Sequence, residues 1–148
     1  MQNLLNLIKL DYVAAAVANA NNTDNDSAIV DMQGFDGVLF LTTITDCAQT
    51  GVATMTIEQN SANSTSGMAA LAGAVATATS AANDDLNGKI LAVDVYRPRE
   101  RYLRANRVSA TANIAFGECQ AILYHGTKMP ITQVDVTDSA IVTSPAES

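Results

Sequence analysis

The chain has 148 residues, 48% of them hydrophobic and only 5% aromatic, and its net charge of −7 argues against general nucleic-acid binding, since neutralising phosphates needs a basic surface. The length suits one domain with a single core of small aliphatic side chains. Apolar burial contributes roughly 25 cal/mol per Å², and alanine offers little area. We therefore expect modest stability from the chain alone and further burial through association.

Residues 1–26 are predicted to form an N-terminal arm. The segment 3–20 has partial helical spacing, but its part 12–17 is equally compatible with a strand. Lys9 and Asp11 interrupt the apolar run near the start, so no signal peptide is expected. No stretch reaches the roughly 18 uncharged apolar residues of a membrane helix, so we expect no membrane partner.

Residues 27–136 are predicted to form an antiparallel β-domain. Segment 38–45 begins apolar on both faces, which predicts a central strand covered on both sides. Segment 52–59 alternates apolar and polar residues, as a half-buried strand does. Its predicted inward residues are Ala53, Met55 and Ile57.

Several shorter segments complete the pattern. A helical turn is expected at 68–72 and a weak strand at 74–79. Further strands are expected at 27–33, 89–96, 102–110 and 118–124, with an edge strand at 131–136. Leu91, Val93 and Val95 share one face of the segment 89–96. About eight short strands with turn signals every eight to twelve residues predict an all-β protein, a jelly-roll-like antiparallel β-sandwich, with an extended C-terminal tail at 137–148.

The sequence contains no motif that predicts a catalytic, cofactor or metal site. His125 is the single histidine, and no nucleophile motif accompanies it. The acidic turns lack the spacing of a calcium loop. Cys47 and Cys119 are 72 positions apart, which fits no zinc or redox motif, so we expect two free, partly buried thiols, with a disulfide between them as the alternative. The chain is therefore not expected to be an enzyme.

The most distinctive stretch is 91–107, which holds five of the eight lysine and arginine residues. Pro98 turns the chain at its centre, in a corner that we define as residues 97–101. One interpretation is a solvated hairpin whose arginines pair locally with Glu100 and Asp94. The other is a protein contact, since arginine and tyrosine are enriched at interfaces. The candidate contact residues are Tyr96, Arg97, Arg99, Arg101, Tyr102 and Arg104.

Three blocks of the sequence resemble the small β-sandwich capsid decoration (cement) proteins of tailed double-stranded DNA bacteriophages. They are Ile-Val-Asp-Met-Gln-Gly-Phe-Asp-Gly-Val-Leu-Phe at 29–40, Leu-Ala-Val-Asp-Val-Tyr-Arg-Pro-Arg-Glu-Arg at 91–101, and Lys-Met-Pro-Ile-Thr-Gln at 128–133, which leads to a Ser-Pro-Ala-Glu end. The resemblance covers residues 27–148. These blocks carry no chemical signature, and no catalytic residues transfer with them.

The resemblance implies a structural role. Such proteins sit on the outside of the phage head, usually as trimers, and clamp neighbouring major capsid subunits. It therefore implies synthesis in the host cytoplasm, the outer capsid surface as location, and two partners, the major capsid protein and further copies of this chain in a homotrimer. Many weak contacts of this kind add up through multivalency.

The sequence is also compatible with other functions. A carbohydrate- or receptor-binding jelly roll, such as a head fibre or adhesin, would present a groove lined with aromatics. A head–tail joining or tail-tube protein would form a sixfold or twelvefold ring. A small β-barrel enzyme would need clustered histidines and carboxylates, which one histidine makes improbable.

Overall fold

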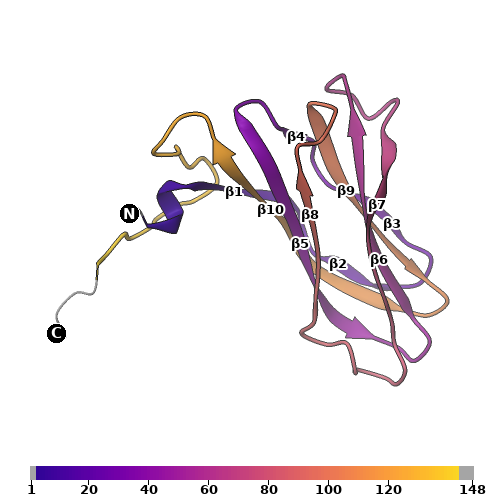
Figure 1. Ribbon diagram of the computed structural model, residues 1–148. Coiled ribbons are helices and arrows are strands. Elements are labelled where there is room, and N and C mark those ends of the chain that lie inside the picture. The colour runs from indigo at the N-terminus through magenta and orange to yellow at the C-terminus, as the bar shows by residue number, and fades with distance from the viewer. Residues whose placement is uncertain (1–2, 144–148) are drawn as a thin grey trace.

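The computed structural model describes residues 3–143, whose regular secondary structure is almost entirely β-strand (Figure 1). Within these residues one short 3-10 helix, η1 (Leu4–Asn6), precedes the strands. The strands are β1 (Ile8–Ala14), β2 (Val17–Ala20), β3 (Asp24–Asp26), β4 (Val30–Asp31), β5 (Phe35–Cys47), β6 (Val52–Asn60), β7 (Ala69–Thr79), β8 (Ile90–Tyr96), β9 (Tyr102–Ala110) and β10 (Ile114–Gly126).

The strands form two five-stranded antiparallel sheets that pack as a sandwich (Figure 1). Sheet A has the order β1-β10-β5-β8, and β2 also pairs with β10. Sheet B has the order β3-β9-β6-β7, and β4 also pairs with β9. The predicted all-β, jelly-roll-like antiparallel β-sandwich is confirmed. No helix among residues 3–143 has the length and apolar character needed to cross a membrane.

Alternating side chains from both sheets fill the core. On β6 the inward residues Ala53, Met55 and Ile57 are fully buried, as the alternation predicts. The predicted inward face of β8 is buried as well. Strands β5 and β10, of 13 residues each, contribute the large buried side chains Phe40 and Phe116. Because most other core residues are small aliphatics, the core has the composition expected from the sequence.

One arginine, Arg107 of β9, is buried inside this core with 1% of its surface exposed. It donates to the carbonyl oxygens of Gly117 (2.6 Å) and Ala15 (2.8 Å), and its guanidinium lies 5.7 Å from the ring centre of Phe116. Burial lowers the pKa of this side chain. A buried charge is tolerated only when it is hydrogen-bonded, so Arg107 is a structural residue that ties β9 to β10 and to the connection between β1 and β2.

The stretch expected as an N-terminal arm supplies β1, β2 and β3 to the two sheets. The helical turn expected at 68–72 is wrong, since β7 begins at Ala69. There Ala69 and Ala70 pair with Gln59 and Glu58 of β6, and this pairing overrides the helical preference of alanine.

The edge strand expected at 131–136 is also absent, although the segment does lie along the edge of β1. Its side chains take the place of a strand. The Gln133 amide accepts from Leu10 N–H (3.0 Å) and donates to Ile8 O (2.6 Å), and the Asp135 carboxylate accepts from Tyr12 N–H (2.9 Å). These bonds satisfy an exposed edge, which would otherwise invite pairing with another chain.

Candidate protein interface

The corner (97–101) joins β8 to β9, and its geometry is fixed by the main chain. Arg97 has a φ of +53°, a left-handed conformation that is uncommon for a residue with a side chain. Its N–H donates to Asp36 O at 2.7 Å, which holds the turn against β5. Pro98 follows and fixes the next φ. Because this turn is strained and held by a hydrogen bond, it fixes the direction of the side chains at the corner.

Two of the predicted arginines are paired with carboxylates from distant segments. Arg101 donates from Nε and Nη2 to the Asp31 carboxylate at 2.8 and 2.9 Å. These bonds lower the pKa of Asp31 below its usual value. Arg104 reaches Glu58 (2.5 Å) and Asp26 (2.9 Å). The local pairing with Glu100 and Asp94 that the hairpin interpretation predicted is not observed.

Arg97 and Arg99 differ from these two. Both are exposed, and neither makes an ion pair with any residue in 3–143. The guanidinium of Arg97 lies 5.2 Å from the ring centre of Tyr96, a cation–π distance. On a protein with 15 acidic residues, two uncompensated guanidinium groups mark the corner as a place that can receive a carboxylate.

A groove of about 460 Å³ lies at this corner. The lining residues, which we call the corner groove, are Met32, Gln33, Phe35, Asp36, Arg97, Pro98, Arg99, Glu100 and Arg101. Met32 is buried and Phe35 half-buried, so they supply an apolar component. Asp36 and Glu100 also face the groove but make no ion pair within the described chain. The groove therefore offers separate sites for acidic, hydroxyl-bearing and apolar side chains.

An aromatic cluster, made by Tyr96, Tyr124 and His125, lies next to the corner on the outer face of sheet A. The two tyrosine rings are parallel with centres 6.5 Å apart, and the imidazole of His125 stands edge-on to both. Tyr124 O–H donates to the Asp94 carboxylate. Burial and this hydrogen bond raise the pKa of Tyr124 to about 12. Sequence reasoning found Tyr96 but missed Tyr124 and His125, which are 28 and 29 residues away.

Gly37 makes room for this cluster. It is the cross-strand neighbour of both Tyr124 on β10 and Tyr96 on β8. A Cβ atom at position 37 would lie 2.2 Å from Tyr124 Cζ. The phenol ring of Tyr124 therefore lies across the bare backbone of Gly37, and the two tyrosines meet over a strand that separates them.

Much of the rest of the outer face of sheet A is apolar, although Gln120, Thr43 and Asp94 also lie on it. Cross-strand neighbours share a face of a sheet, so the register places Leu10 beside Ile122, and Ile122 beside Leu39. Their half-buried or exposed companions on this face are Ile8, Tyr12, Leu41, Ile90 and Ala92. Ile90 is 62% exposed. The central strand β5 is thus covered on one face only, and the prediction of cover on both sides is wrong within this chain.

The six predicted contact residues do not form one surface. Tyr96 lies on the outer face of sheet A, and Arg97, Arg99 and Arg101 line the corner groove. Tyr102 and Arg104 lie on the outer face of sheet B, where they are the cross-strand neighbours of Asn60 and Glu58. The surface around Arg97 and Arg99 is therefore continuous with sheet A through Tyr96, while Arg104 belongs to the opposite side.

Other reactive groups do not gather into a site. Among residues 3–143, no three His, Cys, Asp or Glu side chains lie close enough together to hold a metal ion. Cys47 and Cys119 are both free and buried, which confirms the thiol prediction over the disulfide. Burial raises the pKa of Cys119 to about 11, so its thiol is unreactive at neutral pH.

No protein-family model matches the chain, and neither does any curated protein. Solved structures do match. The PBSX exported protein XepA aligns with a TM-score of 0.55 and 16% identity over 97% of this chain and 45% of that one. Two structures of infectious bursal disease virus, strains Gx and Gt, align with TM-scores of 0.47 and 0.40 and identities of 10% and 12%, each over 83% of this chain and 33% of theirs. The chain thus spans less than half the length of XepA, and at 16% identity the two proteins share a β-sandwich fold.

Proposed function

We propose that the protein is a structural protein of a phage virion that binds the outside of the head and clamps neighbouring major capsid subunits. The observation that carries the proposal is the outer face of sheet A, which presents leucine, isoleucine and tyrosine where a solvated sheet presents polar residues. Exposed apolar surfaces of this kind mark contacts with other proteins. The sequence blocks that resemble decoration proteins support the same function.

The surface suits adhesion better than catalysis. It is broad, and its titratable groups are few and engaged, as Asp94 is with Tyr124. Beside β1 lies a hollow of about 300 Å³ whose lining combines the apolar Leu10, Ile122 and Val136 with Tyr12 and the polar Asp11, Gln120 and Asp135. A capsid side chain with an apolar body and a hydrogen-bonding tip fits such a hollow. Many copies, each with a modest contact, would together resist the pressure of packaged DNA.

The test is co-sedimentation with heads that lack the protein. Lysines introduced at Tyr12 and Ile90, both exposed on sheet A, are expected to abolish binding because docking would bury the new charges. Lysines at Val75 and Thr77, both exposed on β7 of sheet B, are the matched control and are expected to leave binding unchanged. Equal binding of the two variants would contradict the proposal. Hexamers or dodecamers in solution would instead favour a head–tail or tail-tube protein.

A second function has one specific observation in its favour. The exposed rings of Tyr96 and His125, beside the half-buried ring of Tyr124, can stack on a sugar, with Arg97 and Asp94 as polar neighbours. Saturation-transfer NMR with host-surface oligosaccharides tests this function. Transfer that disappears in Tyr96→Ala would support a carbohydrate-binding role, whereas no transfer to any oligosaccharide would leave the capsid contact as the use of this face.

A further inference from the structure

The corner groove has charges that its own chain does not satisfy. Arg97 and Arg99 lack carboxylate partners in 3–143, whereas Arg101 and Arg104 have them at 2.5 to 2.9 Å. The apolar side chains of Met32, Phe35 and Pro98 lie in the same groove. An occupant is therefore expected to combine a carboxylate with an aliphatic side chain in an extended segment.

The C-terminal segment 137–143, which we call the projecting tail, has that composition. It reads Thr-Asp-Ser-Ala-Ile-Val-Thr. Asp138 makes no ion pair within the described chain, and its carboxylate accepts only from Ser139 N–H (2.9 Å). Ile141 and Val142 are 48% and 61% exposed, so both aliphatic side chains are available to a partner.

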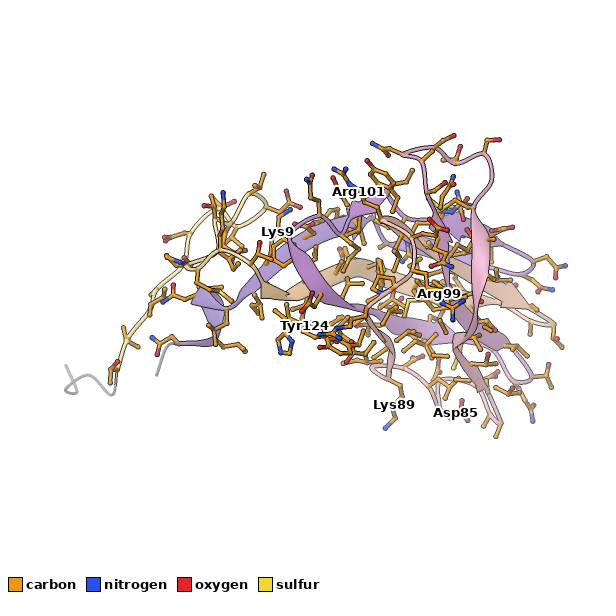
Figure 2. The ribbon with its side chains drawn as sticks, turned by 45° about the horizontal axis from the view of Figure 1, so that its top comes forward. Lys9, Asp85, Lys89, Arg99, Arg101 and Tyr124 are labelled. Carbon is orange, nitrogen blue, oxygen red and sulfur yellow. The ribbon has the colours of Figure 1, made fainter. Side chains whose placement is uncertain are left out.

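The projecting tail points away from its own corner. Gln133 and Asp135 fasten the preceding segment to the edge of β1, at the opposite side of sheet A from β8. Beyond them one bond, from Asn3 Nδ2 to Val142 O (3.3 Å), holds the tail beside the N-terminal segment. Figures 1 and 2 both show the tail leaving the sandwich on the side away from the corner. Figure 2 labels Arg99 and Arg101 at the corner.

We propose that the projecting tail of one copy docks in the corner groove of a second copy. Asp138 pairs with Arg97 and Arg99. The hydroxyl groups of Thr137 and Ser139 can donate to the carboxylates of Asp36 and Glu100, which also line the groove. Ile141 covers the apolar side chains of Met32 and Phe35. The contact joins two different surfaces, so repetition closes a ring, of which the trimer is one case.

Charge complementarity favours a second copy as the occupant. Two copies with a net charge of −7 repel each other unless cations of one meet carboxylates of the other. Five of the eight basic residues lie between 97 and 107, and Arg97 and Arg99 are exposed and unpaired within the described chain. The inference goes beyond the proposed function, because it assigns the corner to self-association and leaves the outer face of sheet A for the capsid.

The test is a pair of charge reversals measured by sedimentation equilibrium. Asp138→Lys and the double change Arg97→Glu with Arg99→Glu are each expected to weaken self-association at least about tenfold, because each brings like charges together. At the other end of the sandwich, where Figure 2 shows Lys89 and Asp85, Asp84→Lys makes the same charge change as Asp138→Lys, and Lys89→Glu reverses one exposed cation. These controls are expected to associate like the wild type. Circular dichroism checks that every variant is folded.

Mixing the two reversed proteins is the decisive step. Where the two variants are neighbours, an intact tail meets an intact groove, or a lysine-bearing tail meets a glutamate-bearing groove. Alternation restores every contact in a ring with an even number of copies and two of the three contacts in a trimer. Association is therefore expected to return. A monomeric wild type, variants that associate normally, or a mixture that stays monomeric would each overturn the inference. Co-sedimentation of Asp138→Lys with heads keeps the two proposals apart, because a monomer that still binds heads contradicts nothing in the proposed function.

Discussion

The two outer faces of the sandwich differ although they belong to one small domain. The outer face of sheet B is mostly polar, and its polar side chains bond to one another. Arg104 pairs with Glu58 and Asp26, and Thr54 bonds to Thr77. Sheet A is apolar outside, with Leu10, Ile122 and Leu39 in a row across three strands. In both sheets, every second side chain along a strand points into the core. The contrast fits the proposed function, in which sheet B faces water and a partner covers sheet A.

The corner lies between these two faces and shows the same division on a smaller scale. On the sheet B side, Arg101 is neutralised by Asp31, as Arg104 of the adjoining strand β9 is by Glu58. On the sheet A side, Arg97 lies against Tyr96 and has no ion pair within residues 3–143. Groups that a monomer leaves unpaired therefore concentrate on one side of the molecule.

The largest expected effect comes from making sheet A resemble sheet B. The double change Leu39→Thr with Leu41→Thr keeps residues that suit strands but removes apolar area from the outer face. We expect binding to undecorated heads to weaken roughly a hundredfold, from a loss of about 3 kcal/mol, as measured by co-sedimentation across a concentration series. The reciprocal change Thr54→Leu with Thr56→Leu on sheet B is the control. Unchanged binding by the threonine variant would break the comparison.

Filling the space at Gly37 should come next. Gly37→Ala places a methyl group where Tyr124 Cζ now lies, so the phenol must rotate away and lose both the Tyr96 stack and the Asp94 bond. We expect a loss of about 1 to 2 kcal/mol in the free energy of unfolding, measured in urea. Gly117→Ala is the matched change, since its Cβ would meet only ordinary contacts, the nearest at 3.4 Å. Equal stability of the two variants would show that the cluster contributes nothing.

On sheet B the expected effect is on stability alone. Arg104→Met removes a guanidinium that serves two carboxylates and leaves Glu58, whose side chain is 20% exposed, without its cation. We expect a loss of about 1 kcal/mol in urea unfolding, reduced by partial exposure of the pair. Binding to heads should not change. Weaker head binding with this variant would assign a contact role to sheet B and so contradict the division between the faces.

The smallest expected effect is an alkaline titration. The pKa of Tyr124 is raised to about 12, so the folded state favours the neutral phenol. The resulting stability is fully present below the unfolded pKa of about 10 and is lost as the pH rises through 12. Absorbance at 295 nm should show one tyrosine of the four ionising late, and the late step should vanish in Tyr124→Phe. A wild-type titration curve with no late step that Tyr124→Phe removes would contradict the raised pKa of Tyr124.

Local alternation was enough to predict much of the fold. The sequence prediction for β9 has the observed bounds, and the inward faces of β6 and β8 are confirmed, because a period of two is set by neighbouring residues. The helical turn at 68–72 failed because pairing with β6 decides the conformation of Ala69 and Ala70. The segment 131–136 failed for a related reason, since Gln133 uses its side chain in place of its backbone.

The candidate site was predictable only in part. The cluster of arginines is visible in the sequence, but their separation into paired and unpaired groups depends on Asp31 and Glu58, which are 70 and 46 residues from their partners. The apolar character of both faces of 38–45 predicted a second cover for β5 that residues 3–143 do not supply. The proposed function assigns that cover to the capsid.

Hydroxyl-radical footprinting of the protein free and bound to heads tests the central claim most directly. The account predicts that binding protects Tyr12, Ile90 and Tyr96 on sheet A, which are more than half exposed in the free protein. Val75 on sheet B, 50% exposed, should react equally in both states. Protection of Val75 with unchanged oxidation of Tyr12 and Ile90 would contradict the account, because the head would then be in contact with the polar face.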